Sequence, residues 1–246
     1  MGILAIRNMK ILKPKVKGHQ RLCFSEQYLG NLLYKEPGLI PMEEIQRPPI
    51  DVIIWGGKLP NGKDFDLLGI DRKGGITIIE TKLGKSPDMK KKVFSQLQRY
   101  TNELRRINYD YLDRLIKDSE GKDLFNLMKA KHIKLGKHQF RDKIDKNLEN
   151  GAILQLIVTD NVGQYSEFLK RIMENKNRLF YAVELACFQY GKSEIIHSRI
   201  FPLVKLELPE KNENTFKDSV TIHCDKKIQE FILKLYKSKK TENTGK

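Results

Sequence analysis

The sequence predicts an α/β domain in which helices flank a mixed central β-sheet. Apolar runs typical of interior strands alternate with amphipathic stretches that have helical spacing. The runs at 65–71 and 76–82 are separated only by the turn formers RKGG, which indicates an antiparallel pair. Farther on, the strand-like runs 152–160 and 179–190 enclose a helical stretch at 164–176. This order is typical of a βαβ unit, so parallel strands are expected as well.

The elements of the first half follow from local patterns. A short strand is expected around 3–11, within a basic N-terminal stretch. The segment 24–33, FSEQYLGNLL, has leucines at helical spacing, and Ser25 can serve as its N-cap, so it should form a helix. The run IDVIIWGG at 50–57 reads as a strand closed by glycines, and the loop LPNGKD separates it from the next strand.

Beyond the central strands the chain is expected to turn helical. Basic residues lie largely away from an apolar stripe formed by Val93, Leu97, Tyr100, Leu104 and Ile107. Residues 108–150 are charged with patchy apolar positions, which predicts a helical insertion whose role the sequence does not show. A further strand is expected within 193–208.

The same patterns divide the chain into segments. Residues 1–207 should form one domain that contains the insertion. The polar stretch 208–218 is typical of a linker, and 219–246 should hold a basic amphipathic helix and a tail.

Composition narrows the classes of function. The chain has 246 residues, of which 39% are hydrophobic and 31% charged, so it can bury a core of its own. Lysine and arginine number 46 against 31 acidic residues, which gives a net charge of +15. This excess favours a polyanionic partner, with nucleic acid first, although a basic surface can also serve solubility alone.

Cysteine usage and hydropathy indicate the compartment. Cys23, Cys187 and Cys224 are scattered without a CxxC spacing, so neither a structural zinc site nor a disulfide framework is expected. No apolar run approaches the ~18 residues of a membrane span. We therefore expect a soluble, cytoplasmic protein that makes no membrane contact.

Two charged residues end the apolar run ITIIETK at 76–82. Glu80 and Lys82 have the i, i+2 spacing that points both side chains to one face of a strand. Charges in such a place are tolerated when they pair, bind a metal or take part in chemistry. Taken alone, the heptapeptide fits a salt bridge at a strand end better than a functional site.

The neighbouring segments add further polar groups. Asp66 lies in the preceding strand, and it can share the face of Glu80 only if the hairpin loop has an odd number of residues, such as three within RKGG. A two-residue turn at Lys73 and Gly74 would instead put Asp66 on the opposite face. Gln96 and Tyr100 lie one turn apart on the next helix, with Gln96 at the border of the apolar stripe, whereas Gln98 is expected to point away.

Three groups of polar residues follow one another along the chain: Asp66, Glu80-x-Lys82 and Gln96-xxx-Tyr100. Their order resembles the PD-(D/E)xK nuclease superfamily, specifically its RecB-like and NucS-like branch with a QxxxY helix. The resemblance covers about residues 24–105 and continues through the strands after 151. It implies a restriction-endonuclease-like core. Glu26 matches an acidic residue that the family carries on an earlier helix, and 108–150 has no counterpart.

The resemblance also implies a function, a magnesium-dependent deoxyribonuclease in which Mn²⁺ can substitute for Mg²⁺. Asp66, Glu80 and Glu26 would bind the metal, and Lys82 would act on the attacking water. Gln96 and Tyr100 would orient Lys82 or contact a phosphate. DNA is the expected partner and a homodimer is compatible with it. Two alternatives remain: an RNA-processing nuclease, and a binding module that keeps the fold without catalysis.

Each assignment has a purely structural alternative. Asp66 can be a surface acid near a turn, Tyr100 a core residue, and Glu26 a carboxylate that favours the positive end of its helix. The run MKKK at 89–92 is typical of a solvated face. The histidines show no metal-ligand spacing and are assigned no role.

Overall fold

The computed structural model describes residues 3–7, 25–86, 92–174, 179–190 and 193–201. The chain divides into two units, Met1–Val204 and Lys205–Lys246, and every described residue belongs to the first. The predicted linker at 208–218 and the predicted helix and tail at 219–246 therefore lie outside the described residues. So do the ends of the two predicted terminal strands, at 8–11 and 202–208.

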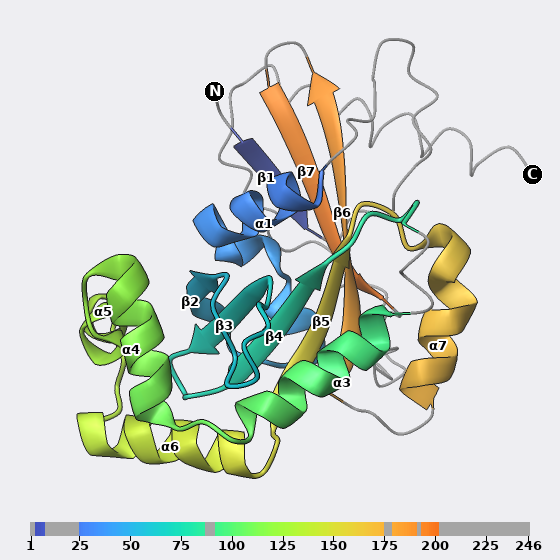
Figure 1. Ribbon diagram of the computed structural model, residues 1–246. Coiled ribbons are helices and arrows are strands. Elements are labelled where there is room, and N and C mark those ends of the chain that lie inside the picture. Colours follow the sequence, from blue (N-terminus) through green and yellow to red (C-terminus); the bar gives the residue numbers. More distant parts are fainter. Residues whose placement is uncertain (1–2, 8–24, 87–91, 175–178, 191–192, 202–246) are drawn as a thin grey trace, which may run out of the picture. The chain divides into compact units, whose positions relative to one another are not determined.

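In the described part of the chain, seven strands form one mixed sheet in the order β1-β7-β6-β5-β4-β3-β2 (Figure 1). Strand β4 pairs antiparallel with β3 and parallel with β5, and β5 pairs parallel with β6 across the predicted βαβ unit. The α/β class with a mixed sheet is thereby confirmed. The strands are β1 (Ile3–Arg7), β2 (Ile50–Trp55), β3 (Leu67–Asp71), β4 (Ile76–Thr81), β5 (Ile153–Thr159), β6 (Phe180–Tyr190) and β7 (Ser193–Phe201).

Helices flank this sheet, and three of them occupy the predicted insertion (Figure 1). The N-cap expected at Ser25 is present, since its hydroxyl accepts a hydrogen bond from the backbone N–H of Tyr28 at 3.0 Å. No helix in the described ranges is both long enough and apolar enough to cross a membrane. The helices are α1 (Glu26–Lys35), α3 (Val93–Leu104), α4 (Tyr109–Glu120), α5 (Leu124–Ala130), α6 (Lys137–Glu149) and α7 (Ser166–Glu174).

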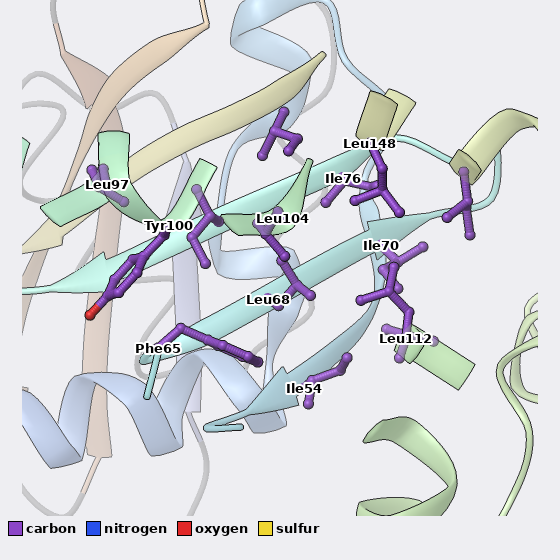
Figure 2. Packing of buried hydrophobic residues seen from close by; sticks show 14 of the residues in the cluster. Ile54, Phe65, Leu68, Ile70, Ile76, Leu97, Tyr100, Leu104, Leu112 and Leu148 are labelled. Carbon is purple, nitrogen blue, oxygen red and sulfur yellow. The ribbon is translucent and has the colours of Figure 1, made fainter. Parts of the chain in front are cut away.

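Each face of the sheet buries its own apolar core. Leu67 and Ile79 belong to the core that includes the buried leucines of α1. Leu68 and Ile78, one position along, belong to the core that α3, α4 and α6 share (Figure 2). Because successive side chains of a strand point to opposite faces, Glu80 has the direction of Ile78 and lies on the face covered by α3.

The hairpin between β3 and β4 has the odd loop length that Asp66 needs in order to share the face of Glu80. The backbone N–H of Asp71 donates to the carbonyl of Gly75 at 3.0 Å, which leaves the three-residue loop 72–74. Gly74 adopts φ 79°, a left-handed conformation that glycine accepts without strain. The ladder then pairs Leu67 with Ile79. One position beyond that pair, Asp66 lies opposite Glu80 on the neighbouring segment.

Candidate functional site

The carboxyl end of β4 brings a buried carboxylate and an ammonium together. All six residues of β4 are buried, and the side chain of Glu80 is 0% exposed. Nζ of Lys82, whose side chain is 16% exposed, lies 3.2 Å from Oε1 of Glu80. The contact confirms that the two side chains share one face. It is an ion pair without hydrogen-bond geometry, and among the described residues neither oxygen of Glu80 finds a hydrogen-bond partner.

Burial dominates the electrostatics of Glu80. The pKa of this carboxyl is raised from 4.5 to about 8, chiefly by burial and then by the nearby charge of Asp66, while Lys82 works in the opposite direction. A fully buried acid that lacks hydrogen bonds is costly to keep ionised. Glu80 therefore holds its proton more readily than an ordinary glutamate unless a further positive charge is present.

Lys82 is shared between two carboxylates. Its Nζ donates to Oε2 of Glu26 at 3.0 Å, and the other oxygen of Glu26 accepts the backbone N–H of Leu83 at 3.3 Å. Burial works to lower the pKa of Lys82, but the negative charges of Glu80 and Glu26 outweigh it and raise the pKa. The ammonium therefore stays protonated. Glu26, in the first turn of α1, reaches the end of β4 from the other side of the sheet.

Asp66 is fixed against the same strand end. Its Oδ2 accepts two hydrogen bonds from Thr81, one from the backbone N–H at 2.8 Å and one from the hydroxyl at 2.9 Å. The carboxylate thus satisfies an N–H just past the last paired residues of the β3–β4 ladder. The charge of Asp66 raises the pKa of Glu80, after burial, so the two carboxyl groups are electrostatically coupled.

Helix α3 brings Tyr100 and Gln96 toward these charges. The Tyr100 residue is 5% exposed and its ring packs in the core, while its hydroxyl points away from the rest of the cluster (Figure 2). Nε2 of Gln96 donates to that hydroxyl at 2.6 Å. Burial raises the pKa of Tyr100, and the charges of Glu80 and Asp66 add to the effect. Tyr100 is therefore a core residue whose polar end lies near the site.

The prediction that Gln98 points away from the sheet is wrong. Its Nε2 donates to Oε1 of Gln155 on β5 at 3.0 Å. Gln155 is 3% exposed, and its own Nε2 donates to the hydroxyl of Thr101 on α3 at 2.9 Å. Sequence reasoning missed this bridge between α3 and β5. The available signal was the single glutamine within the apolar run at 152–160.

A second feature that the sequence did not reveal holds the segment after Lys82. Oδ1 of Asp160, directly after β5, accepts the backbone N–H of Gly84 at 2.6 Å. A Cβ at Gly84 would come within 2.3 Å of the carbonyl oxygen of Asn161, so only glycine allows the two loops to approach this closely. The loop after β5 thereby fixes the chain that leaves the site.

Asp66 and Glu80 are two electrostatically coupled carboxyl groups that could supply oxygen ligands to a metal ion. Among the residues in the described ranges, no group of three or more His, Cys, Asp or Glu side chains is arranged to hold a metal ion. Glu26 is engaged with Lys82 and Leu83 instead of joining the other two carboxylates. Two carboxylates remain, and the unbonded oxygens of Glu80 are the atoms that a cation could satisfy.

Comparison with known proteins does not identify this arrangement. No family model, curated protein or solved structure matches the chain. What the site does must therefore be inferred from its own geometry and chemistry.

Proposed function

We propose that the chain is a metal-dependent nuclease with a restriction-endonuclease-like core, which hydrolyses DNA phosphodiester bonds. The observation that carries the proposal is the carboxylate of Glu80, which is fully buried beside the ammonium of Lys82 and accepts no hydrogen bond from any residue that the structure describes. A buried pair that only stabilised the fold would gain most if its remaining lone pairs were hydrogen-bonded. Carboxylate oxygens in this environment suit the coordination of a cation.

Asp66 and Glu80 would hold that cation, Mg²⁺ with Mn²⁺ as a substitute. Carboxylate oxygens suit these hard ions, and Mg²⁺ usually takes only one or two carboxylates besides waters and substrate phosphates. When bound, the ion would supply a more acidic water and neutralise charge on the phosphate. The assignment of Glu26 as a third ligand is the least supported of the three, because this residue already binds Lys82.

The chain's own residues would then position the phosphate and the attacking water. Lys82 is held by Glu26 and Glu80 and stays protonated, so it would act as a hydrogen-bond donor and countercharge in the transition state. The raised pKa of Lys82 argues against a role as proton acceptor while both carboxylates are ionised. Tyr100, held by Gln96, would offer a hydroxyl to the phosphate or to Lys82.

A cleavage assay with the full chain tests the proposal. Single-stranded, double-stranded and branched DNA, together with an RNA of the same sequence, are incubated with Mg²⁺, Mn²⁺ or EDTA. We expect cleavage of DNA with either metal and none in EDTA. Cleavage of RNA alone would favour the RNA-processing alternative. Binding without cleavage of any substrate would favour the module that keeps the fold without catalysis, and would end the nuclease proposal.

A further inference from the structure

The connection between α5 and α6 carries a cluster of cations far from the candidate site. We call residues 129–138 the α5–α6 turn. From Asp123 to Asp142 the chain contains no intervening acidic residue. The basic side chains of the turn all belong to exposed residues: Lys129, Lys131, His132, Lys134, Lys137 and His138.

These cations stand on an ordered part of the backbone. The backbone N–H of Ile133 donates to the carbonyl of Met128 at 3.3 Å, and that of His132 to the carbonyl of Lys129 at 3.0 Å. Ile133 and Leu135 are partly buried against the core of the α3 face. The buried parts of Ile133 and Leu135 thus anchor the backbone of the turn, while its lysines lie on the exposed side.

The lysines of the turn have no carboxylate partner in the part of the chain that the structure describes, and only Lys129 lies over an aromatic ring, that of Phe125. Among the described residues, no carboxylate forms an ion pair with any of the four lysines of the turn, whereas nearby Arg141 pairs with Asp110. Lys137 lies in the first turn of α6, which contains no acidic residue, so it opposes the positive end of the helix dipole. This repulsion is relieved when an anion binds.

Helix α6, which follows the turn, contacts the end of β4 opposite to the candidate site. Nδ2 of Asn147 on α6 donates to the carbonyl of Gly74, in the hairpin that precedes β4, at 2.7 Å. Glu80 and Lys82 lie at the other end of that strand, roughly 15–20 Å along it at the usual rise per residue. Figure 1 shows α5 and α6 beside the hairpin end. The turn is thus a separate surface.

We propose that the α5–α6 turn binds the phosphate backbone of nucleic acid. Lysines at fixed positions neutralise phosphates without reading bases, so this binding would be independent of sequence. An anionic membrane would attract the same charges, but a stable interfacial contact also needs apolar side chains to insert. In the described part of the chain the only large hydrophobic residue that is exposed is Trp55, outside the turn. The inference does not require that the chain cut its ligand.

Two triple variants of the full chain distinguish the contribution of this turn to binding from the effect of overall charge. The test variant is Lys131→Gln, Lys134→Gln and Lys137→Gln. The control is Lys35→Gln, Lys63→Gln and Lys117→Gln, three exposed lysines elsewhere that each precede an acidic residue. Both variants lose the same charge. Binding to a labelled DNA duplex is measured in EDTA over a series of salt concentrations, after circular dichroism and thermal unfolding have shown that both variants fold.

For the test variant we expect affinity at low salt to fall about tenfold or more. The slope of log K against log salt should become shallower by about two to three, near one per lysine lost. The control should stay within about twofold of the wild type. Equal losses in both variants, or no duplex binding by the wild type at low salt, would overturn the inference. The inference would also be overturned if the test variant alone lost binding to phosphatidylserine vesicles while its binding to the duplex stayed unchanged.

This outcome is independent of catalysis. A wild type that never cuts DNA but loses binding in the test variant alone would support the turn and end the nuclease proposal. If the wild type cuts DNA and both triple variants bind DNA as tightly as the wild type, the nuclease proposal would be supported and the inference about the turn would be overturned.

Discussion

Nζ of Lys82 lies 3.2 Å from Oε1 of Glu80, and that carboxylate is fully buried and accepts no hydrogen bond within the described part of the chain. The pair therefore differs from a surface salt bridge, in which water solvates the remaining lone pairs. One ammonium that is also shared with Glu26 compensates the buried charge only in part. The consequences for catalysis, stability and metal binding can be measured separately.

Substitution of Lys82 by alanine should affect the chemical step far more than binding. If Lys82 stabilises charge that develops in the transition state, single-turnover cleavage of DNA should slow on the order of a hundredfold or more. DNA affinity should change little, because one cation among many is lost. Lys85→Ala, at an exposed lysine three residues on, is the control and should cut as fast as the wild type. Equal rates for Lys82→Ala and wild type would exclude this role.

The raised pKa of Glu80 predicts a specific pH dependence of stability. Between its ordinary value of 4.5 and its folded value of about 8, this acid binds more protons in the folded state than in the unfolded state. The free energy of unfolding should therefore fall as pH rises through this interval, by at most about 5 kcal/mol from this group. Glu80→Gln, which cannot titrate here, should gain stability relative to the wild type over the same interval.

Urea unfolding of metal-free protein in EDTA, at about pH 5 and about pH 8, measures this difference. Glu149→Gln, at an exposed carboxylate, is the matched control and should follow the wild type at both pH values. If the Glu80→Gln variant also keeps the wild-type difference between the two pH values, Glu80 does not titrate as the buried geometry implies.

Divalent metal should stabilise the wild type through Asp66 and Glu80. An ion that binds only the folded state raises the midpoint of thermal unfolding, by several degrees when its concentration is well above its dissociation constant. Asp66→Asn and Glu80→Gln should abolish most of the shift with Mg²⁺ or Mn²⁺. Asp66→Asn is suitable because an amide oxygen can still accept the hydrogen bonds from Thr81.

The control for metal binding is Asp64→Asn, at an exposed carboxylate two residues before Asp66, which should keep the full shift. Scanning calorimetry or fluorescence-monitored melting provides the midpoints. If neither metal raises the unfolding midpoint of the wild type, the proposal that the chain binds a divalent metal is wrong. If the midpoint rises equally in the wild type and in all the variants, the ion binds at another place.

Replacement of Gln155 by leucine tests how α3 is held over the sheet. The change leaves Gln98 and Thr101 without their partner, which should cost about 1–3 kcal/mol in the free energy of unfolding. Gln98→Ala should cost less, because that side chain is only partly buried. A double-mutant cycle between Gln98 and Gln155 should give a coupling of about 1 kcal/mol. A coupling of zero would mean that the bridge does not contribute to stability.

The sequence alone determined the class of the fold and its order of elements. Alternating apolar runs and helical stripes are local signals, so the strands of the sheet, the βαβ unit and the helical insertion were all predictable from neighbouring residues. The turn formers RKGG predicted the hairpin but left its loop length open, and the structure decided for the three-residue loop that puts Asp66 across from Glu80. The i, i+2 spacing predicted the contact between Glu80 and Lys82 in the same way.

Only the tertiary structure decided which groups meet around that contact. Glu26 and Lys82 are 56 residues apart in the chain, and nothing local brings their side chains to 3.0 Å. The direction of Gln98 was wrongly predicted because helical periodicity does not show which border of an apolar stripe faces the sheet. Its partner Gln155 belongs to a strand that is distant in the sequence. The burial of Glu80, and hence its raised pKa, depends on the tertiary packing around the end of β4. Long-range packing sets the local dielectric and the distances between charges, and a sequence pattern carries neither quantity.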